Sequence, residues 1–174
     1  MYLDRAGEVI PGLSVDGAMA AGIPGEPAAL AHIAAHYGRL PLGASLGPAT
    51  RLARDGFEVD AHYRRLAQFR LQALQSDPEA ARIFLQDDAV PAPGRLILQP
   101  DLAATLAAIA RDGRAGFYAG DVARRLVDGV RAAGGIWTLA DLAEYRVIER
   151  RPVVGQYRDL RITSAAPPSS GGVA

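Results

Sequence analysis

The sequence predicts an α+β protein that is mainly α, with a helical lobe over residues 1–144 and a β-hairpin within residues 145–174. Apolar residues, chiefly alanine and leucine, make up 49% of the chain and aromatic residues 6%, which favours closely packed helices. Apolar positions recur at helical spacing as far as Glu144, and β-branched residues recur nearly every second position after Tyr145. The expected order is therefore helices first and strands last.

Residues 1–23 are rich in glycine and predict a turn at Asp4–Gly7, followed by a short buried extended piece at "GAMAAGI". A first helix starts near Pro27, because proline has no N–H to leave unpaired in a first helical turn. Its expected buried face carries Leu30, Ile33, Ala34 and Tyr37. The helix should end at Gly38, and Pro41 prevents its continuation.

Three further helices are expected before the first long loop. A short helix over "SLGPATRLARDG" ends at Gly56, and a longer one covers residues 60–75 with a broad apolar stripe. The third follows Asp77, whose side chain can cap it, with Pro78 at the first helical position. The loop "DDAVPAPGRLILQP" comes next, with a brief strand at Leu96–Leu98.

Two apolar stripes in the second half of the lobe predict two more helices, which end at Gly113 and at residues 134–135. The stripes consist of Leu102, Leu106, Ile109 and Ala110, and of Val122, Leu126 and Val130. Charged residues opposite the second stripe should face water: Arg124, Arg125, Asp128 and Arg131. "TLAD" then predicts a capping box, in which the Thr138 hydroxyl and the Asp141 carboxylate accept from early amide groups.

The last part of the chain predicts two strands, over "YRVIERRPVV" and "GQYRDLRITS". The turn between them is expected at Arg158–Asp159, because aspartate tolerates a left-handed backbone. A lone hairpin is marginal in water, so other structure should lie beside it. Without such a neighbour, the unpaired strands and the apolar surface around residues 147–162 should promote self-association.

Composition excludes several classes of function. Lys+Arg and Asp+Glu number 19 each, so the basic excess of a nucleic-acid-binding protein is absent. All the cationic residues are arginine and there is no cysteine, which excludes lysine and thiol nucleophiles, zinc–thiolate sites and disulfides. The longest apolar run, Leu102–Ala110, is too short to span a bilayer. The N-terminal residues lack the apolar stretch of a signal peptide.

Two histidines form one candidate site. His32 and His36 stand four residues apart on one helix, a spacing that can bind a metal. No carboxylate lies between them in a metalloprotease pattern, and the one other histidine is His62. Surface or helix-packing histidines are therefore the favoured interpretation. Neither a metal nor an organic cofactor is predicted.

The segment "PPSSGG" is a second candidate site. Ser169 and Ser170 could be nucleophiles, but the Gly-x-Ser-x-Gly elbow is absent and no spacing positions a His and an Asp. The backbone of residues 170–172 could form an anion nest, yet the lysine of a phosphate loop is missing. A structural motif is favoured, in which prolines direct the chain, glycines permit a sharp bend and serines cap a following helix. Its members are Pro167, Pro168, Ser169, Ser170, Gly171 and Gly172.

Several stretches together resemble one family, the γ-glutamyltranspeptidases, also called glutathione hydrolases. They are "GIPGEPAALAHIAAHYGRLPL", "GPATRLARDGFEV", the run from Leu96 to Val153, "QYRDLRI" and "PPSSGG". These segments occur in the family's order and spacing and cover nearly the whole chain. The run from Gln99 to Tyr145 followed by "PPSSGG" is highly specific for the family.

The resemblance implies an N-terminal nucleophile hydrolase with a four-layer αββα sandwich. Such an enzyme is one precursor that cuts itself into a large and a small subunit, and the new N-terminal threonine of the small subunit attacks the γ-glutamyl amide. The present chain resembles the middle of the large subunit. The arginine that grips the substrate is expected before Met1 and the threonine after Ala174, so the chain itself carries none of the family's catalytic residues and is expected to be inactive alone.

The resemblance also implies the partners of the chain. These are the remainder of the large subunit and the small subunit of the same precursor, with a small-molecule γ-glutamyl substrate in the parent enzyme. No nucleic acid and no membrane span are expected in this chain. The residues leave the compartment undetermined, and the family implies a periplasmic or secreted parent.

A few positions depart from the family's pattern. Ala29, Leu42, Asp159 and Ala166 stand where the family usually has glycine, tryptophan, glycine and proline. These changes concern packing and turn geometry, and they leave a divergent subgroup open, including acylase-type relatives with a different acyl group and relatives in capsule processing. A further alternative is a non-catalytic helical interaction module derived from the family.

Overall fold

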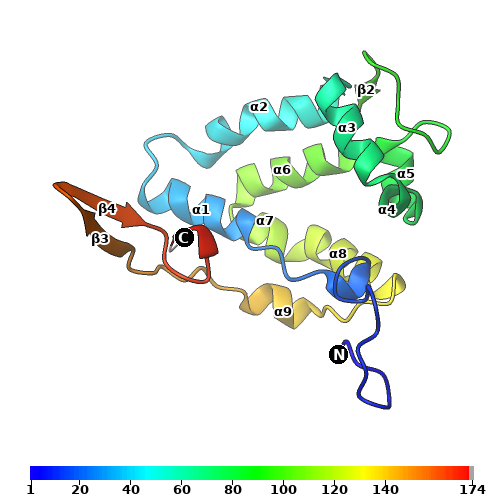
Figure 1. The fold of residues 1–174 in the computed structure, drawn as a ribbon. Coiled ribbons are helices and arrows are strands. Elements are labelled where there is room, and N and C mark those ends of the chain that lie inside the picture. The colour runs from blue at the N-terminus through cyan, green and yellow to red at the C-terminus, as the bar shows by residue number, and fades with distance from the viewer. Residues whose placement is uncertain (173–174) are drawn as a thin grey trace.

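The computed structural model describes residues 1–172 and shows a helical body from which a β-hairpin projects (Figure 1). The helical segments are η1 (Ala18–Ala20), α1 (Glu26–His36), α2 (Leu42–Asp55), α3 (Ala61–Phe69), α4 (Leu71–Gln75), α5 (Pro78–Phe84), α6 (Pro100–Asp112), α7 (Ala115–Tyr118), α8 (Gly120–Ala132), α9 (Leu139–Glu144) and η2 (Ser170–Gly172). The strands form two separate antiparallel pairs: β1 (Phe57–Glu58) with β2 (Leu96–Ile97), and β3 (Val153–Tyr157) with β4 (Leu160–Ser164). The mainly helical α+β class is therefore confirmed. The last two residues of the unit expected over 145–174 lie outside the described part.

Helices α2 and α6 lie side by side in the body (Figure 1). Small residues allow this approach, since a Cβ on Gly43 would already lie 3.6 Å from the carbonyl oxygen of Ala110. Helix α6 begins at Pro100 and ends before Gly113, whose φ is 58°. Both boundaries agree with the expectation that proline starts a helix and glycine ends it.

The core of the body lies between α1, α2, α6, α7, α8 and α9. Leu142 of α9 has no exposed surface, and the Trp137 indole N–H donates to the carbonyl oxygen of Ala21 at 2.9 Å. The capping box of α9 is confirmed, because the side chains of Thr138 and Asp141 each accept from the other's backbone N–H. The charged residues expected to face water on α8 are exposed: Arg124, Arg125, Asp128 and Arg131.

Tyr118 joins three parts of this core and is only 2% exposed. Its hydroxyl donates to the carbonyl oxygen of Pro24 and accepts the N–H of Ala28 at 3.2 Å. Its ring stacks on Tyr145 with 5.6 Å between the ring centroids. The Arg114 guanidinium lies 4.9 Å from the Tyr118 ring centroid and donates to the Tyr145 carbonyl oxygen at 2.7 Å. The entry to α1 and the exit from α9 are thereby fixed to each other.

Two expectations for the N-terminal part are wrong. "GAMAAGI" is not an extended piece, because Ala18–Ala20 form the short 3₁₀ helix η1. The face of α1 that was expected to be buried is largely exposed, with Ile33 at 53%. The buried residue of α1 is Ala28, on the side that meets Tyr118. The periodicity located the helix correctly but could not say which side has a neighbour within residues 1–172.

The helix expected over residues 60–75 is divided in two at Arg70. The backbone of this residue, with φ −107° and ψ 14°, leaves the helical region, and its N–H donates to the carbonyls of Leu66 and Ala67. Its guanidinium donates to the Asp16 carboxylate at 2.5 Å. This pairing ties the N-terminal segment to the corner between α3 and α4. The Asp77 cap of α5 and the strand at β2 are confirmed.

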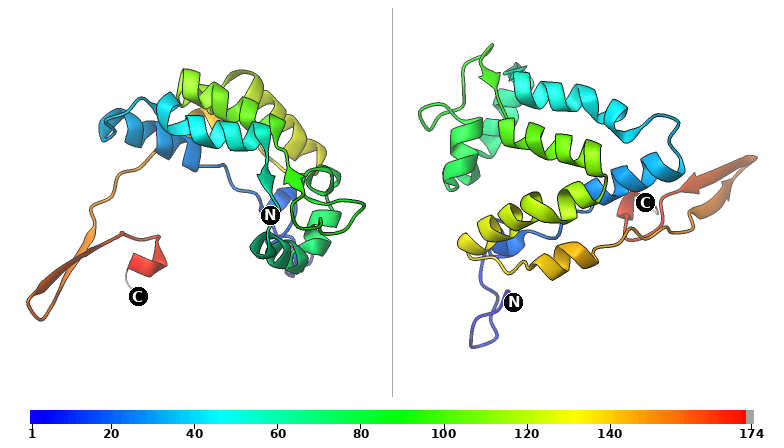
Figure 2. Two further views of the ribbon diagram at one scale, coloured as in Figure 1. Left: turned by 90° about the horizontal axis from the view of Figure 1, so that it is seen from above. Right: turned by 180° about the vertical axis from the view of Figure 1, so that it is seen from behind.

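Residues 146–172 form an arm that leaves the body after α9 (Figure 2). The first strand begins at Val153 rather than near Tyr145, and Pro152, which lacks an N–H, immediately precedes it. The turn lies at Arg158–Asp159 as expected, but the left-handed residue is Arg158, with φ 55°. None of the helices within residues 1–172 combines the length and apolarity that crossing a membrane requires.

The hairpin has one apolar and one polar face. Residues opposite each other in an antiparallel pair lie on the same face, and neighbours along a strand alternate between faces. Val153, Tyr157, Leu160 and Ile162 share one face, whereas Val154, Gln156, Arg161 and Thr163 share the other. No described residue covers the apolar face, and Leu160 is 62% exposed.

Candidate functional site

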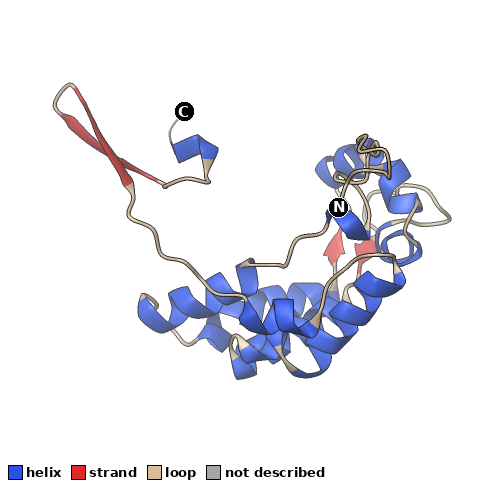
Figure 3. Ribbon diagram, turned by 90° about the horizontal axis from the view of Figure 1, so that it is seen from below, coloured by secondary structure: helices blue, strands red, loops and turns tan. Residues whose placement is uncertain are grey.

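The segment "PPSSGG" forms a compact turn after β4 (Figure 3). The N–H of Ser169 donates to the carbonyl oxygen of Ala166 at 3.3 Å, and the N–H of Gly172 donates to that of Ser169 at 3.2 Å. The Pro167–Pro168 peptide bond is cis, and residues 170–172 form η2. The two prolines and two serines are all exposed.

The glycines of this turn have different roles. A Cβ on Gly172 would overlap the carbonyl oxygen of Ala165, whereas one on Gly171 would meet no atom within 4 Å. The crossing of the backbone at Gly172 therefore requires glycine. Within residues 1–172, no hydrogen bond joins either serine hydroxyl to a histidine or a carboxylate, so the described segment contains no nucleophile–base pair.

A second cluster forms where α1 meets the arm. The Nε2 atom of His32 lies 2.6 Å from Oε1 of Glu149, and the Tyr37 hydroxyl donates to the same oxygen at 3.0 Å. The His36 ring stacks on the His32 ring with centroids 4.2 Å apart. Its Nδ1–H donates to the His32 carbonyl oxygen at 2.9 Å. The two histidines are therefore neighbours, as their spacing predicts, and Glu149 is the additional member.

The electrostatics of this cluster follow from its hydrogen bonds. Donation from His32, and then from Tyr37, stabilises the ionised form of Glu149 and lowers the pKa of that carboxyl. The hydrogen bond to Glu149 raises the pKa of the Tyr37 hydroxyl. The cluster is partly open to water, with the His32 side chain 24% and the Glu149 side chain 60% exposed.

The cluster offers a carboxylate held by two donors but no nucleophile. In the part of the chain that the structure describes, no three His, Cys, Asp or Glu residues are arranged to hold a metal ion. The third histidine, His62, lies elsewhere, with Nδ1 3.1 Å from an Arg65 guanidinium nitrogen. Glu149 is 117 residues from His32 along the chain, so no local spacing could have revealed it.

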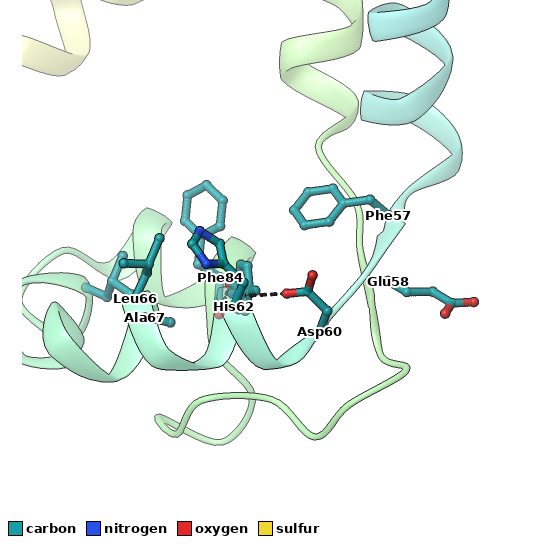
Figure 4. Close-up of a pocket in the computed structure, with 9 residues that line it drawn as sticks. Phe57, Glu58, Asp60, His62, Leu66, Ala67 and Phe84 are labelled. Atoms are coloured by element: carbon teal, nitrogen blue, oxygen red, sulfur yellow. Dashed lines mark hydrogen bonds between the residues drawn. The ribbon is translucent and has the colours of Figure 1, made fainter.

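A groove of about 460 Å³ lies beside α3 (Figure 4). Its apolar lining includes Phe57 and Tyr63, whose rings meet edge to face with centroids 6.1 Å apart. The Tyr63 hydroxyl donates to the Phe84 carbonyl oxygen at 2.7 Å, and burial raises its pKa. The Asp60 carboxylate accepts the Tyr63 N–H at 2.7 Å as the cap of α3. Three polar residues also line the groove, Glu58, Asp60 and His62, and Glu58 points away from Phe57 (Figure 4).

Known proteins match this chain over nearly its whole length. The family model described as Gamma-glutamyltranspeptidase matches residues 1–174. A glutathione hydrolase proenzyme of Pseudomonas sp. (strain A14) is 39% identical over 178 residues, which cover 99% of this chain and 30% of the relative. The acylase ACY 1 proenzyme of Pseudomonas sp. (strain SE83) is 38% identical over 160 residues, which cover 92% of this chain and 29% of the relative.

The fold of this chain also matches that of a solved structure. The γ-glutamyltranspeptidase of Helicobacter pylori matches this chain with a TM-score of 0.95 and 38% sequence identity, over 99% of this chain and 50% of that one. The matched part is therefore only a fraction of the relatives: 50% of the Helicobacter pylori chain and 30% of the glutathione hydrolase proenzyme from Pseudomonas sp. (strain A14).

Proposed function

The chain belongs to the γ-glutamyltranspeptidase family, and we propose that it is part of an enzyme that hydrolyses γ-glutamyl amides such as glutathione or transfers the γ-glutamyl group to amino acids or peptides. The main support is the agreement with the Helicobacter pylori γ-glutamyltranspeptidase over 99% of the chain. Glutathione hydrolase proenzymes among its relatives support the same reaction class.

In this proposal the catalytic groups lie outside the chain. Cleavage of a γ-glutamyl amide by covalent catalysis needs a nucleophile, a base beside it and donors for the developing oxyanion. Neither the exposed serines of the "PPSSGG" turn nor the Glu149 cluster supplies such a set. The parent's threonine nucleophile, released by self-cleavage of the precursor, is the proposed source, and the chain alone is proposed to be inactive.

The proposed partners are the remainder of the large subunit and the small subunit of the same precursor. The relatives are named proenzymes, and this chain covers 30% of the two glutathione hydrolase proenzymes from Pseudomonas sp. (strain A14) and Escherichia coli. The hairpin supports this assignment, because an apolar face such as that of Leu160 and Ile162 needs a covering layer.

We place the division of the chain at residue 144, with the helical lobe before it and the hairpin and "PPSSGG" turn joining the αββα sandwich after it.

An acylase-type parent is the second candidate. The acylase ACY 1 proenzyme is 38% identical to this chain and the glutathione hydrolase proenzyme of Pseudomonas sp. (strain A14) is 39% identical. Such similar sequence identities do not decide whether the parent acts on a γ-glutamyl group or on another acyl group. The residues that contact the acyl group in the parent decide between these substrates.

The two candidates differ in what the processed parent cleaves. We expect the purified parent precursor to divide into two subunits and then to release the chromophore from a γ-glutamyl anilide. A matched anilide with an acyl group other than γ-glutamyl serves as the acylase substrate and should be cleaved far more slowly under the same conditions. Faster cleavage of the acylase substrate would favour the acylase candidate, and cleavage of neither by the processed parent would contradict both.

A further inference from the structure

Beyond Val147, one carboxylate of the arm makes the hydrogen bonds to the helical body. Within residues 1–172, the hydrogen bonds between residues 147–172 and the helical body all end on Glu149. Both donors, His32 and Tyr37, lie at the end of α1. The connection is therefore concentrated at one point between the body and the hairpin.

The backbone around this point has little other support. Residues 146–152 form neither helix nor strand, and Ile148, Glu149 and Arg150 are all exposed. Val147 packs against the core cluster of the body, which fixes the start of the arm but not its direction beyond that residue. The hairpin itself projects away from the helices (Figures 2 and 3). Without Glu149, the segment after Val147 would be free to rotate.

The donors are well placed to hold a carboxylate. His32 is restrained by the stacked ring of His36 at 4.2 Å, and Tyr37 contacts the same oxygen of Glu149. Hydrogen bonds to an ionised acceptor are stronger than those between neutral groups. Two donors, one on α1 and one at its C-cap, also define the position of the carboxylate better than a single donor does.

We propose that Glu149 is a latch that sets the direction of the hairpin arm, and that loss of its contacts with His32 and Tyr37 lets the arm swing about residues 148–152. Glu149 is thus a positioning residue for the arm. The proposal is independent of the reaction that the parent catalyses, because it concerns only the contacts between α1 and the arm.

The chain has no cysteine, so two introduced cysteines can be labelled specifically to measure the direction of the arm. Spin labels attached at Ala107→Cys on α6 and Thr163→Cys on β4 report the distance between body and hairpin by pulsed electron paramagnetic resonance. Both positions are exposed. Dilution of the doubly labelled chain into excess unlabelled chain removes distances between copies.

The wild-type background is expected to give one narrow distance peak. Glu149→Gln should broaden it, and the ratio of latched to released molecules should fall about fivefold, the upper range for a partly exposed ion pair. His32→Gln should act in the same direction without altering the arm. Glu144→Gln, a matched change on the exposed end of α9, should leave the peak unchanged.

Two results of the distance measurement would overturn the proposal. One is a narrow and unshifted peak in both Glu149→Gln and His32→Gln, since the arm would then be held without the latch. The other is a peak in the wild-type background as broad as that of the variants. The thermal unfolding of the body, followed by circular dichroism, is expected to be the same in all these proteins. A large drop in the melting temperature of Glu149→Gln alone would assign Glu149 to the stability of the body and also contradict the latch.

Discussion

Gly25, in the motif "GIPGEP", shows how one missing side chain fixes the course of the backbone. A Cβ on Gly25 would clash with the hydroxyl of Tyr145, which lies across the entry to α1. The two residues are 120 positions apart in the numbering, yet they lie against each other. The glycine therefore serves tertiary packing, since its φ of −101° is accessible to any residue.

We expect Gly25→Ala to destabilise the chain by about 1–3 kcal/mol through overpacking against Tyr145. Tyr145→Phe in the same chain removes the clashing oxygen and should restore part of this loss. Gly22→Ala is the control, because a Cβ there meets no atom within 4 Å. Urea unfolding of the four proteins measures the effect; equal losses in Gly25→Ala and Gly22→Ala would contradict it.

The buried hydroxyl of Tyr118 is also expected to contribute to the stability of the fold. Tyr118→Phe leaves the N–H of Ala28 and the carbonyl of Pro24 without their partner. Buried groups left unpaired in this way cost about 1–3 kcal/mol, so the melting temperature should fall. Tyr157→Phe on the exposed hairpin is the matched control and should leave it unchanged. No difference between the two variants would show that the Tyr118 hydroxyl does not contribute to stability.

The ionisation of Glu149 gives a prediction with a defined sign. Hydrogen bonds from His32 and Tyr37 hold the pKa of this carboxyl below its ordinary value of 4.5. The contribution of Glu149 is therefore present above the pKa of the free carboxyl and is lost as the pH falls through the lowered pKa. A carboxyl-carbon NMR titration should place the midpoint of Glu149 below 4.5, and His32→Gln should raise it. A midpoint at or above that value in the wild-type chain would contradict the hydrogen bonds seen here.

Helix α9 is short and is held at both ends by side chains. It spans only residues 139–144, too few to be stable alone. The capping box of Thr138 closes its first turn. At its last turn, the Arg114 guanidinium donates to the Ala143 carbonyl oxygen at 2.9 Å. Both ends are thus satisfied by side chains.

Thr138→Ala should destabilise the chain by about 1 kcal/mol, the usual effect of losing an N-cap side chain. Thr163→Ala on the exposed face of β4 is a suitable control, since this threonine caps no helix. Hydrogen exchange of the amides of residues 139–144 measures the effect locally. Unchanged protection of these amides in Thr138→Ala would mean that the box does not hold α9.

The sequence was sufficient to predict elements whose boundaries are determined locally. Pro100 and Gly113 delimit α6, and the Asp77 cap starts α5, because these residues act through their own backbone geometry. It was insufficient where a distant contact decides. Arg70 divides the helix expected over residues 60–75 and pairs with Asp16. The periodicity of neither segment could predict this pairing.

The same distinction applies to the candidate site. The spacing of His32 and His36 correctly placed them together, because a helix brings such positions to one face. Glu149 lies in the irregular segment 146–152 of the arm, far from the histidines along the chain, and was missed. The "PPSSGG" turn was predicted to be structural, and the structure gives a physical reason for glycine at Gly172; its role in the parent remains a prediction.

The chain exposes many large apolar side chains. The apolar face of the hairpin has no neighbour in the described part of the chain, and the outer face of α1 is largely uncovered. Large exposed apolar surfaces usually mark an interface. In the parent, the proposed neighbour is the rest of the precursor, and in its absence copies of the chain should associate.

We expect the purified chain to sediment as a concentration-dependent mixture in analytical ultracentrifugation. Leu160→Lys combined with Ile162→Lys should raise the dissociation constant about tenfold, because two apolar side chains of the proposed interface are replaced by charges. Thr163→Lys, on the opposite face of the same hairpin, should have little effect. A wild-type chain that stays monomeric at all concentrations, or equal effects of the two faces, would contradict this interface.

The proposed division between a catalytic parent and a non-catalytic chain is tested most directly by a side-by-side assay. The purified chain and the purified parent precursor are each incubated with a γ-glutamyl anilide, and release of the chromophore is followed at equal molar concentration. We predict no release above background by the chain, and turnover by the parent once it has divided into its subunits. Release by the chain alone, or a fully processed parent that leaves the γ-glutamyl bond intact, would contradict the proposed function.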